Sequence, residues 1–257
     1  MQDIKDYLTT CEEQWDRKGR IAHAFATYWG AADTAYTRLV SRIFFCSMVM
    51  RAHHPGEPLH YAPVFMGGQG AGKSEALAIL GGKWFSDAPF SVGKKEDAGP
   101  RLNRIWLYEI AELDMFTRAE IAALKAIISS TTYHYRERLT ARRVAVPLIT
   151  CFACTTSDNT FFHDSTSHRR FWPVAVQQVD LDALRRDRDM LFGEAVHMWE
   201  NGALWFPTRE EERHVLAPAL HAADVHFEQN RHQLSGAHLR GACGQLFSPA
   251  QLVNGAD

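Results

Sequence analysis

The sequence has little that would suggest export, a membrane span or a strong overall charge. Its 28 basic and 30 acidic residues nearly cancel, so any binding of nucleic acid must come from a local patch. The longest early apolar run, residues 43–50, is far shorter than the roughly 20 residues that cross a bilayer, and predicts a core helix. No charged segment followed by an apolar stretch and a cleavage site opens the chain. We therefore expect a cytoplasmic protein with no membrane contact.

Cysteine is also scarce, and its pattern is unlike that of a disulfide framework. The five cysteines are odd in number and scattered, as suits a reducing compartment. Cys151 and Cys154 form a CxxC pair, but positions three apart on an extended strand point to opposite faces. They are not expected to hold one metal ion, and the 13 histidines include no HExxH motif.

Hydrophobic patterning predicts an α/β protein. Helical spacing fills most of residues 1–52, and HHPGEP breaks it at residues 53–58. Expected strands at 61–66, 104–110 and 144–156 alternate with expected helices at 74–80 and 118–130. Such alternation favours a mostly parallel sheet flanked by helices. The expected division is an N-terminal helical region at 1–58, a core at 59–206, and a C-terminal helical segment and tail at 207–257.

The stretch FMGGQGAGKSEAL, residues 65–77, ends an apolar strand in glycines and then opens a helix. Gly67, Gly72, Lys73 and Ser74 fit GxxxxGK[ST], which chance produces in roughly one chain of this length in a hundred. Such a turn wraps backbone amides around phosphates, while Lys73 adds charge and the Ser74 hydroxyl can ligate Mg²⁺. The sequence therefore predicts a P-loop NTPase core. The expected nucleotide contacts are Gly67, Gly68, Gln69, Gly70, Ala71, Gly72, Lys73, Ser74 and Glu75.

A P-loop site needs an acid at the end of a neighbouring strand, and IWLYEIAEL supplies Glu109 and Glu112. Glu109 ends the apolar run and is predicted to hold Mg²⁺, which leaves Glu112 to polarise water; alternatively, one of the two merely caps the loop. The strand that ends in CFACTTSDN should lie beside them. Its polar end includes Ser157 as a candidate sensor of the γ-phosphate, although a simple polar turn fits as well.

Two further groups of arginines are candidates for binding phosphate groups. Arg169 and Arg170 precede the apolar segment FWPV; either can act on a γ-phosphoryl group, or both can form a solvated strand edge. The stretch YHYRERLTARR, residues 133–143, interleaves arginines with tyrosines, as single-strand-binding surfaces do, although a solvated hairpin has the same composition. The candidate nucleic-acid contacts are Lys125, Arg136, Arg138, Arg142 and Arg143.

The assembled order of motifs resembles the virulence-associated protein E family, which is related to superfamily 3 helicases within the AAA+ ATPases of phages, plasmids and mobile islands. The matching blocks run from WDRKGRI through GGQGAGKS, GGKWFSD and WLYEIAEL to TTSDNTFFHDSTSHRRFWPV, about residues 15–176. The resemblance implies an AAA+-like core, ATP and Mg²⁺ as ligands, and a hairpin that points into a central pore. It also implies a homo-oligomeric ring, commonly a hexamer, with Arg169 or Arg170 as a finger between subunits.

This sequence departs from the family pattern at two places. Ser157 stands where Asn is expected, and Ser167-His168 replace Gly-Asn before the arginine pair. A shorter serine would sense the γ-phosphate poorly, so hydrolysis is expected to be slow or to depend on assembly. No primase-like N-terminal segment is visible, so priming is expected to be absent or to lie on another chain.

The leading hypothesis is an ATP-dependent, helicase-like motor that acts on single-stranded DNA during replication of a mobile element. An alternative of another class is an ATP-gated binding module that captures a replication protein with little or no unwinding. A small-molecule kinase is a third alternative, but no second polar pocket is evident in the sequence and the basic stretch would have no role in it.

Overall fold

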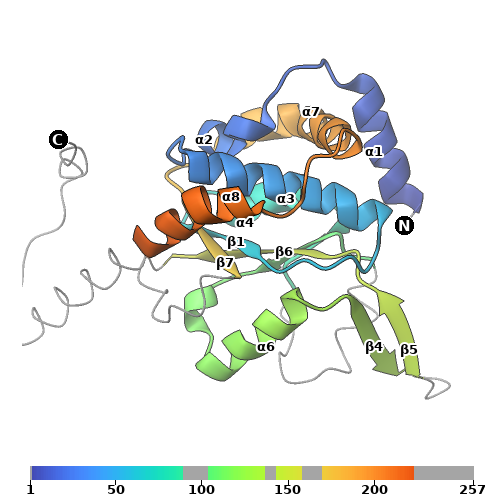
Figure 1. Ribbon diagram of the computed structural model, residues 1–257, viewed down its shortest axis with the longest axis vertical. Coiled ribbons are helices and arrows are strands. Elements are labelled where there is room, and N and C mark those ends of the chain that lie inside the picture. The colour runs from blue at the N-terminus through green and yellow to red at the C-terminus, as the bar shows by residue number, and fades with distance from the viewer. Residues whose placement is uncertain (1, 89–103, 137–142, 158–169, 223–257) are drawn as a thin grey trace, which may run out of the picture.

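The computed structural model describes residues 2–88, 104–136, 143–157 and 170–222 (Figure 1). The helices are α1 (Gln2–Gln14), α2 (Ala24–Trp29), α3 (Ala35–His53), α4 (Lys73–Gly81), α6 (Arg118–Ile128), α7 (Leu181–Glu200) and α8 (Arg209–Glu211), with single turns at Ile21–His23, Gly82–Trp84, Leu113–Met115 and Glu212–Leu216. The strands are β1 (Ala62–Met66), β2 (Phe85–Ser86), β3 (Leu107–Ile110), β4 (Thr132–Arg136), β5 (Arg143–Pro147), β6 (Cys151–Thr156) and β7 (Phe171–Ala175).

Five of these strands form one parallel sheet, in the order β2-β3-β6-β1-β7. The strand that comes first in the chain, β1, lies inside the sheet between β6 and β7. Its Phe65 pairs with Thr155 on one side and with Val174 on the other. Because the strands are parallel, the segments that follow β1, β3 and β6 meet at one edge of the sheet. The predicted α/β class with a parallel sheet is confirmed.

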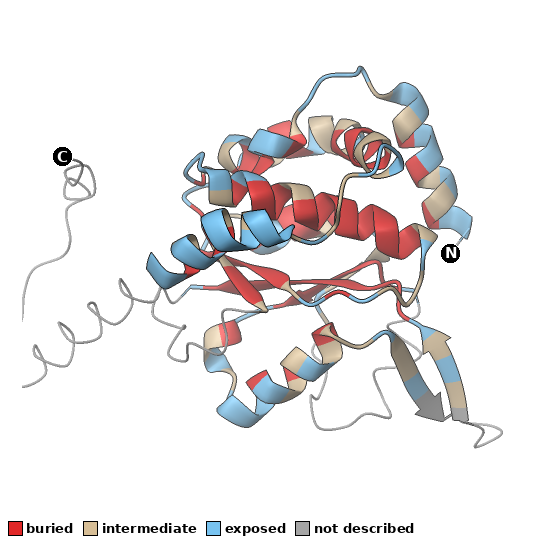
Figure 2. Cartoon of the chain, in the orientation of Figure 1, coloured by how far each residue is buried: buried red, intermediate tan, exposed pale blue. Residues whose placement is uncertain are grey.

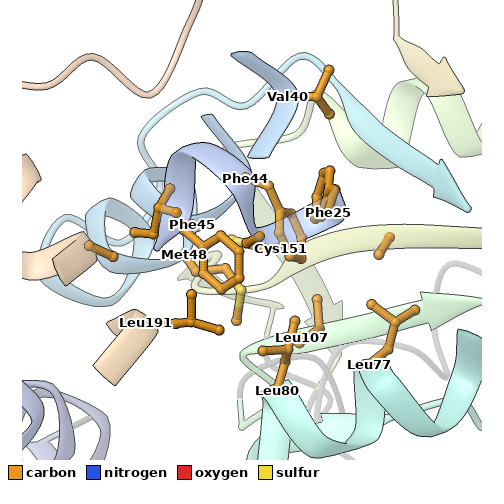
Figure 3. Packing of buried hydrophobic residues seen from close by; sticks show 14 of the residues in the cluster. Phe25, Val40, Phe44, Phe45, Met48, Leu77, Leu80, Leu107, Cys151 and Leu191 are labelled. Carbon is orange, nitrogen blue, oxygen red and sulfur yellow. The ribbon is translucent and has the colours of Figure 1, made fainter. Parts of the chain in front are cut away.

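Helices cover both faces of the sheet (Figure 1). The larger core joins α1, α2, α3, α4 and α7 to one face, and α6 packs on the other. Figure 2 shows the buried residues along α3 and the sheet strands between these layers, and Figure 3 shows side chains of the larger core, among them Phe25, Phe45, Leu77 and Leu191. Full burial of each such side chain contributes about 1.5–3 kcal/mol, so this contact surface dominates the stability of the fold.

Sequence signals explain where two of the helices start. The Thr34 hydroxyl accepts from the Thr37 amide at 3.1 Å at the start of α3, and Thr117 with Glu120 forms the same kind of reciprocal cap on α6. Each cap satisfies backbone donors that would otherwise be unpaired and contributes about 1 kcal/mol. The apolar run Ile43–Met50 lies buried within α3, as a core helix requires.

The prediction of one strand at residues 144–156 is wrong, because this apolar stretch forms two strands in different sheets. Its first part belongs to β5, which pairs antiparallel with β4 in a separate hairpin, and its last part is β6 in the main sheet. Between them Leu148, Ile149 and Thr150 are buried without belonging to either strand, and the Leu148 amide donates to Thr131 O at 3.0 Å. The apolar run gave no sign of this break, because a run of apolar residues indicates burial but does not indicate which strands pair.

The N-terminal helices share their core with the sheet and α7, so they pack directly on the rest of the fold. The division at residues 58 and 206 stays a prediction. In the part of the chain that the structure describes, no helix combines the length and the apolarity needed to cross a membrane.

Candidate active site

The loop between β1 and α4 forms a turn at the C-terminal edge of the sheet. Its first glycine allows a close approach, because a Cβ on Gly67 would lie 2.4 Å from the carbonyl oxygen of Val176. Gly72, the N-cap residue that precedes α4, has a φ of 84°, a backbone conformation that other residues rarely adopt. Gly68, Gln69 and Gly70 between them are exposed. The turn therefore presents its backbone to solvent at a helix N-terminus, as phosphate binding requires.

The Lys73 side chain folds back over this turn. Its ammonium group donates to Gly67 O at 2.6 Å and to Gly68 O at 2.8 Å, and the residue is 8% exposed. Burial lowers the pKa of Lys73, and the charge of the Glu109 carboxylate opposes that shift. The side chain thus places a donor group directly beside the loop that would hold phosphate.

Glu109, at the end of β3, faces the first turn of α4. The Ser74 hydroxyl donates to its Oε1 at 2.6 Å, and the Thr155 hydroxyl donates to the same oxygen at 2.6 Å. The residue is 2% exposed, and its Oε2 is buried without a hydrogen-bond partner. A buried carboxylate oxygen without a partner is costly, and a Mg²⁺ ion or its water shell would satisfy it. The donor set of Ser74 and Glu109 therefore fits the predicted metal role.

The second predicted acid, Glu112, lies just beyond β3 and is exposed, with a φ of 51°. A non-glycine residue held in this left-handed region costs about 1–3 kcal/mol, and such positions concentrate at functional sites. Two residues further on, Asp114 accepts a hydrogen bond from the Thr156 hydroxyl. Ser157, directly after the end of β6, is exposed. Asp114 was not expected from the sequence, although it is a further acid soon after Glu112.

A second contact that the sequence did not indicate joins Glu75 to α7. Arg185 donates to the Glu75 carboxylate in the first turn of α4 and to Asp182 at 3.0 Å. The loop before α7 is also attached to the turn, because the Val179 amide donates to Ala71 O at 3.0 Å. Both contacts join segments more than a hundred residues apart, which no local pattern reveals.

The structure does not bring Arg170 to the turn of its own chain. Its carbonyl oxygen accepts from the Ala62 amide at 2.7 Å, at the start of β1, whereas the turn follows the end of β1. At about 3.3 Å per residue, roughly 16 Å of strand separates Arg170 from Gly67. Its Nε donates to the Ser129 hydroxyl at 3.0 Å. Arg169 lies outside the described residues.

The predicted nucleic-acid contacts lie on α6 and the β4–β5 hairpin. Lys125 is half-buried on α6, which leads into β4 (Figure 1). Arg136 and Arg143 are partners on one rung of the hairpin ladder. Arg138 and Arg142 lie outside the described residues.

The two cysteines of the CxxC pair lie on opposite faces of the sheet, as their spacing on a strand predicts. Cys151 belongs to the core on one face of the sheet and Cys154 to the core on the other. Among the described residues, no cluster of His, Cys, Asp and Glu is suited to hold a metal ion by itself.

Comparison with solved structures supports the fold. The A-form apo structure of the NrS-1 C-terminal region has a TM-score of 0.51 and 13% identity, over 92% of this chain and 53% of that one. Another apo structure of this region has a TM-score of 0.47 and 15% identity, over 75% of this chain and 45% of that one. This chain thus spans about half the length of these two structures. At 13% identity, the likeness to the first of them is one of fold alone.

Comparison with curated proteins gave no match. The profile of the virulence-associated protein E-like domain matches residues 8–223, which contain the P-loop, both predicted acids, the basic hairpin and the arginine pair. The match covers most of the sequence, so the chain belongs to the virulence-associated protein E-like domain family.

Proposed function

We propose that the chain is a Mg²⁺-dependent ATPase that drives a helicase-like motor on single-stranded DNA during replication of a phage, plasmid or mobile island. One observation carries the ATPase: the Ser74 hydroxyl donates to a buried Glu109 carboxylate whose other oxygen has no partner, beside the Lys73 ammonium group. Strand and helix residues far apart in sequence meet here at the edge where ligands bind in parallel sheets.

Lys73 has a clear part in nucleotide binding. In the structure its ammonium group is held by two loop carbonyls, and phosphate oxygens entering the turn would compete for the same donors. Charge-assisted bonds to phosphate are stronger than bonds to neutral carbonyls, so the exchange favours the bound nucleotide. The exposed backbone of Gly68–Gly70 supplies further contacts.

Ser74 and Glu109 are arranged for the metal before any ligand arrives. Because the Ser74 proton already points to Glu109, the oxygen lone pairs of Ser74 remain for a cation. Mg²⁺ bound there would neutralise charge on the phosphates. Thr155 fixes the orientation of the Glu109 carboxylate from β6, and exposed Glu112 is available to orient water.

The remaining positive charge would come from a second subunit. Arg170 lies at the opposite edge of the sheet from its own P-loop, so it can serve a nucleotide only on a neighbouring copy. We therefore propose a homo-oligomeric ring, of the hexameric kind that the family resemblance implies, in which the hairpin with Arg136 and Arg143 contacts DNA phosphates.

The direct test is ATP hydrolysis with and without Mg²⁺ and single-stranded DNA. We expect Mg²⁺-dependent hydrolysis that DNA stimulates and that Lys73→Ala abolishes, with light scattering showing assembly in a non-hydrolysable ATP analogue. An Arg136→Ala/Arg138→Ala double variant should keep DNA-independent hydrolysis and lose salt-sensitive DNA binding. Failure of the wild-type protein to bind ATP and Mg²⁺ would reject the ATPase.

Ser157 favours the alternative of an ATP-gated module that captures a replication protein. A serine at this exposed strand end reaches less far than the expected asparagine, which suits slow hydrolysis and a long-lived ATP state. Unwinding of a forked duplex separates the two proposals. Tight ATP binding without unwinding by the wild-type protein supports the module, and unwinding that Lys73→Ala abolishes supports the motor.

A further inference from the structure

The root of the β4–β5 hairpin is fixed to α3 by a buried arginine. Arg51 is fully buried, and its guanidinium donates to Leu148 O at 2.9 Å and to Ser130 O at 3.3 Å, one on each side of the hairpin. The Gly56 amide also donates to Leu148 O, at 2.8 Å. The hairpin forms no part of the main sheet, and these contacts at its root, together with the packing of Tyr133 on the second core, attach it to the rest of the fold.

A second arginine reaches the same root from β7. Arg170 Nε donates to the hydroxyl of Ser129, the residue that caps the C-terminal end of α6 and leads into β4. A hydrogen bond through Nε orients the guanidinium, while the two Nη groups at its end carry further N–H donors that an anion can take as a fork. Ser129 is therefore placed to orient Arg170 through a contact that uses Nε and neither Nη group.

We propose that Ser129 is a positioning residue that links Arg170 to the root of the hairpin. Through this link, nucleotide at a subunit boundary and DNA at the hairpin change each other's affinity. The inference rests on the proposed function and adds to it a specific connection within each subunit. Arg170 is fixed by its backbone at the start of β7, so movement of its side chain towards a neighbouring nucleotide acts on Ser129. Ser129 adjoins Ser130, whose carbonyl Arg51 holds.

Such coupling is reciprocal, because it is a free energy shared by the two binding events. If bound nucleotide tightens DNA binding by a given factor, DNA must tighten nucleotide binding by the same factor. Coupling between sites commonly amounts to about 5- to 150-fold, and loss of the Ser129 hydroxyl should bring that factor close to one.

Ser130 offers a matched control. It is the same residue type one position along the chain, but its hydroxyl donates to Ala126 O at 2.8 Å within α6 and its carbonyl remains available to Arg51. Ser129→Ala removes the contact to Arg170, Ser129→Thr restores a hydroxyl, and Ser130→Ala removes a hydroxyl of no proposed role. All three leave the P-loop unchanged.

The experiment measures the affinity for a labelled single-stranded oligonucleotide by anisotropy, with Mg²⁺ and with or without a non-hydrolysable ATP analogue. We expect a ratio of affinities well above one for wild type, Ser129→Thr and Ser130→Ala, and a ratio near one for Ser129→Ala, whose ATP binding is retained. A ratio for Ser129→Ala equal to that of Ser130→Ala overturns the inference while the proposed function stands. Absence of both ATP and DNA binding in the wild type rejects the proposed function itself.

Discussion

The hydroxyl of Ser74 lies 2.6 Å from Oε1 of Glu109, which joins the first turn of α4 to the end of β3. Thr155 donates to the same oxygen from β6, so a hydroxyl from each of two other elements fixes the carboxylate. The second oxygen, Oε2, is left buried without a partner. This pattern orients the carboxylate before any ligand binds, which is what a metal site at a P-loop needs.

Glu109→Gln tests the metal role, because it keeps the shape of the side chain and removes the negative charge. The glutamine oxygen can still accept from Ser74 and Thr155, so the variant should fold. We expect ATP hydrolysis to fall by about 10²–10³-fold, the size of loss typical for removing one electrostatic group from a catalytic site. The thermal stabilisation that Mg²⁺-ATP gives the wild-type protein should shrink as well.

Thr155→Val provides the comparison for that variant. It removes one of the two hydroxyls that orient Glu109 but leaves the charge and the Ser74 contact, so the loss of hydrolysis should be smaller than in Glu109→Gln. Equal Mg²⁺ dependence in the wild-type protein and Glu109→Gln, measured by titration of hydrolysis against Mg²⁺, would remove Glu109 from the metal site.

Lys73→Met tests the turn. The ammonium group that bonds to Gly67 O and Gly68 O is a charged donor directly beside the loop proposed to hold phosphate, so we expect ATP affinity to fall by about 10- to 100-fold, or roughly 1.4–2.8 kcal/mol. Lys83→Met is a matched control, because Lys83 follows α4 and pairs with Asp3 at 2.8 Å on an exposed surface. Calorimetric titration with an ATP analogue should show normal affinity in the control and the loss in Lys73→Met.

The turn before α4 and the place of Glu109 at the end of a neighbouring strand could be predicted because short runs of contiguous residues indicate them. The stretch Gly67–Ser74 is a single motif, and Glu109 ends an apolar run beside it in the sheet. The order of strands, by contrast, depends on which hydrophobic faces pack best, and the sequence contains no local signal for the position of β1 between β6 and β7.

Three of the contacts that were not predicted join distant segments. Arg185 with Glu75, Thr156 with Asp114, and Arg170 with Ser129 are separated by 110, 42 and 41 residues. Each contact exists only because the sheet and its helices bring the segments together. A single sequence shows that such polar residues are present but not which of them meet.

Buried thiols give a pH-dependent prediction for the fold. Burial raises the pKa of Cys46 and Cys151 to about 12 and that of Cys11 to about 11, and it raises the pKa of Cys154 as well. Because the thiolate is the reactive form, these cysteines should resist a thiol reagent at pH 8 until the protein unfolds. Cys243→Ser removes the cysteine outside the described residues and makes the measurement specific to these four.

The same shifts set the sign of a stability change. The ordinary thiol pKa is 9.0, so between about pH 9 and 12 the unfolded chain loses protons that the folded chain retains. The free energy of unfolding should therefore be unaffected by these groups below pH 9 and fall as the pH rises through that window. Rapid labelling of the Cys243→Ser protein at pH 8 without denaturant would contradict the buried arrangement.

Arg51→Met tests whether the hairpin depends on α3. The substitution replaces the guanidinium with an unbranched apolar side chain, so Ser130 O loses its donor from Arg51, whereas Leu148 O keeps the Gly56 amide. Burial already lowers the pKa of Arg51, so replacing the charge removes a desolvation cost and offsets part of the loss. We expect a net decrease of about 1–3 kcal/mol in the free energy of unfolding by urea, the range for losing hydrogen bonds made by a charged group. Arg17→Met, which removes an exposed ion pair with Glu12, should change the free energy of unfolding by less than about 1 kcal/mol.

Hydrogen exchange in Arg51→Met separates a local from a global effect. Faster exchange at Thr132–Arg136 and Arg143–Pro147, with unchanged exchange in β1 and β6, would place the effect at the hairpin. Equal acceleration in all four strands would contradict a specific role for Arg51 there.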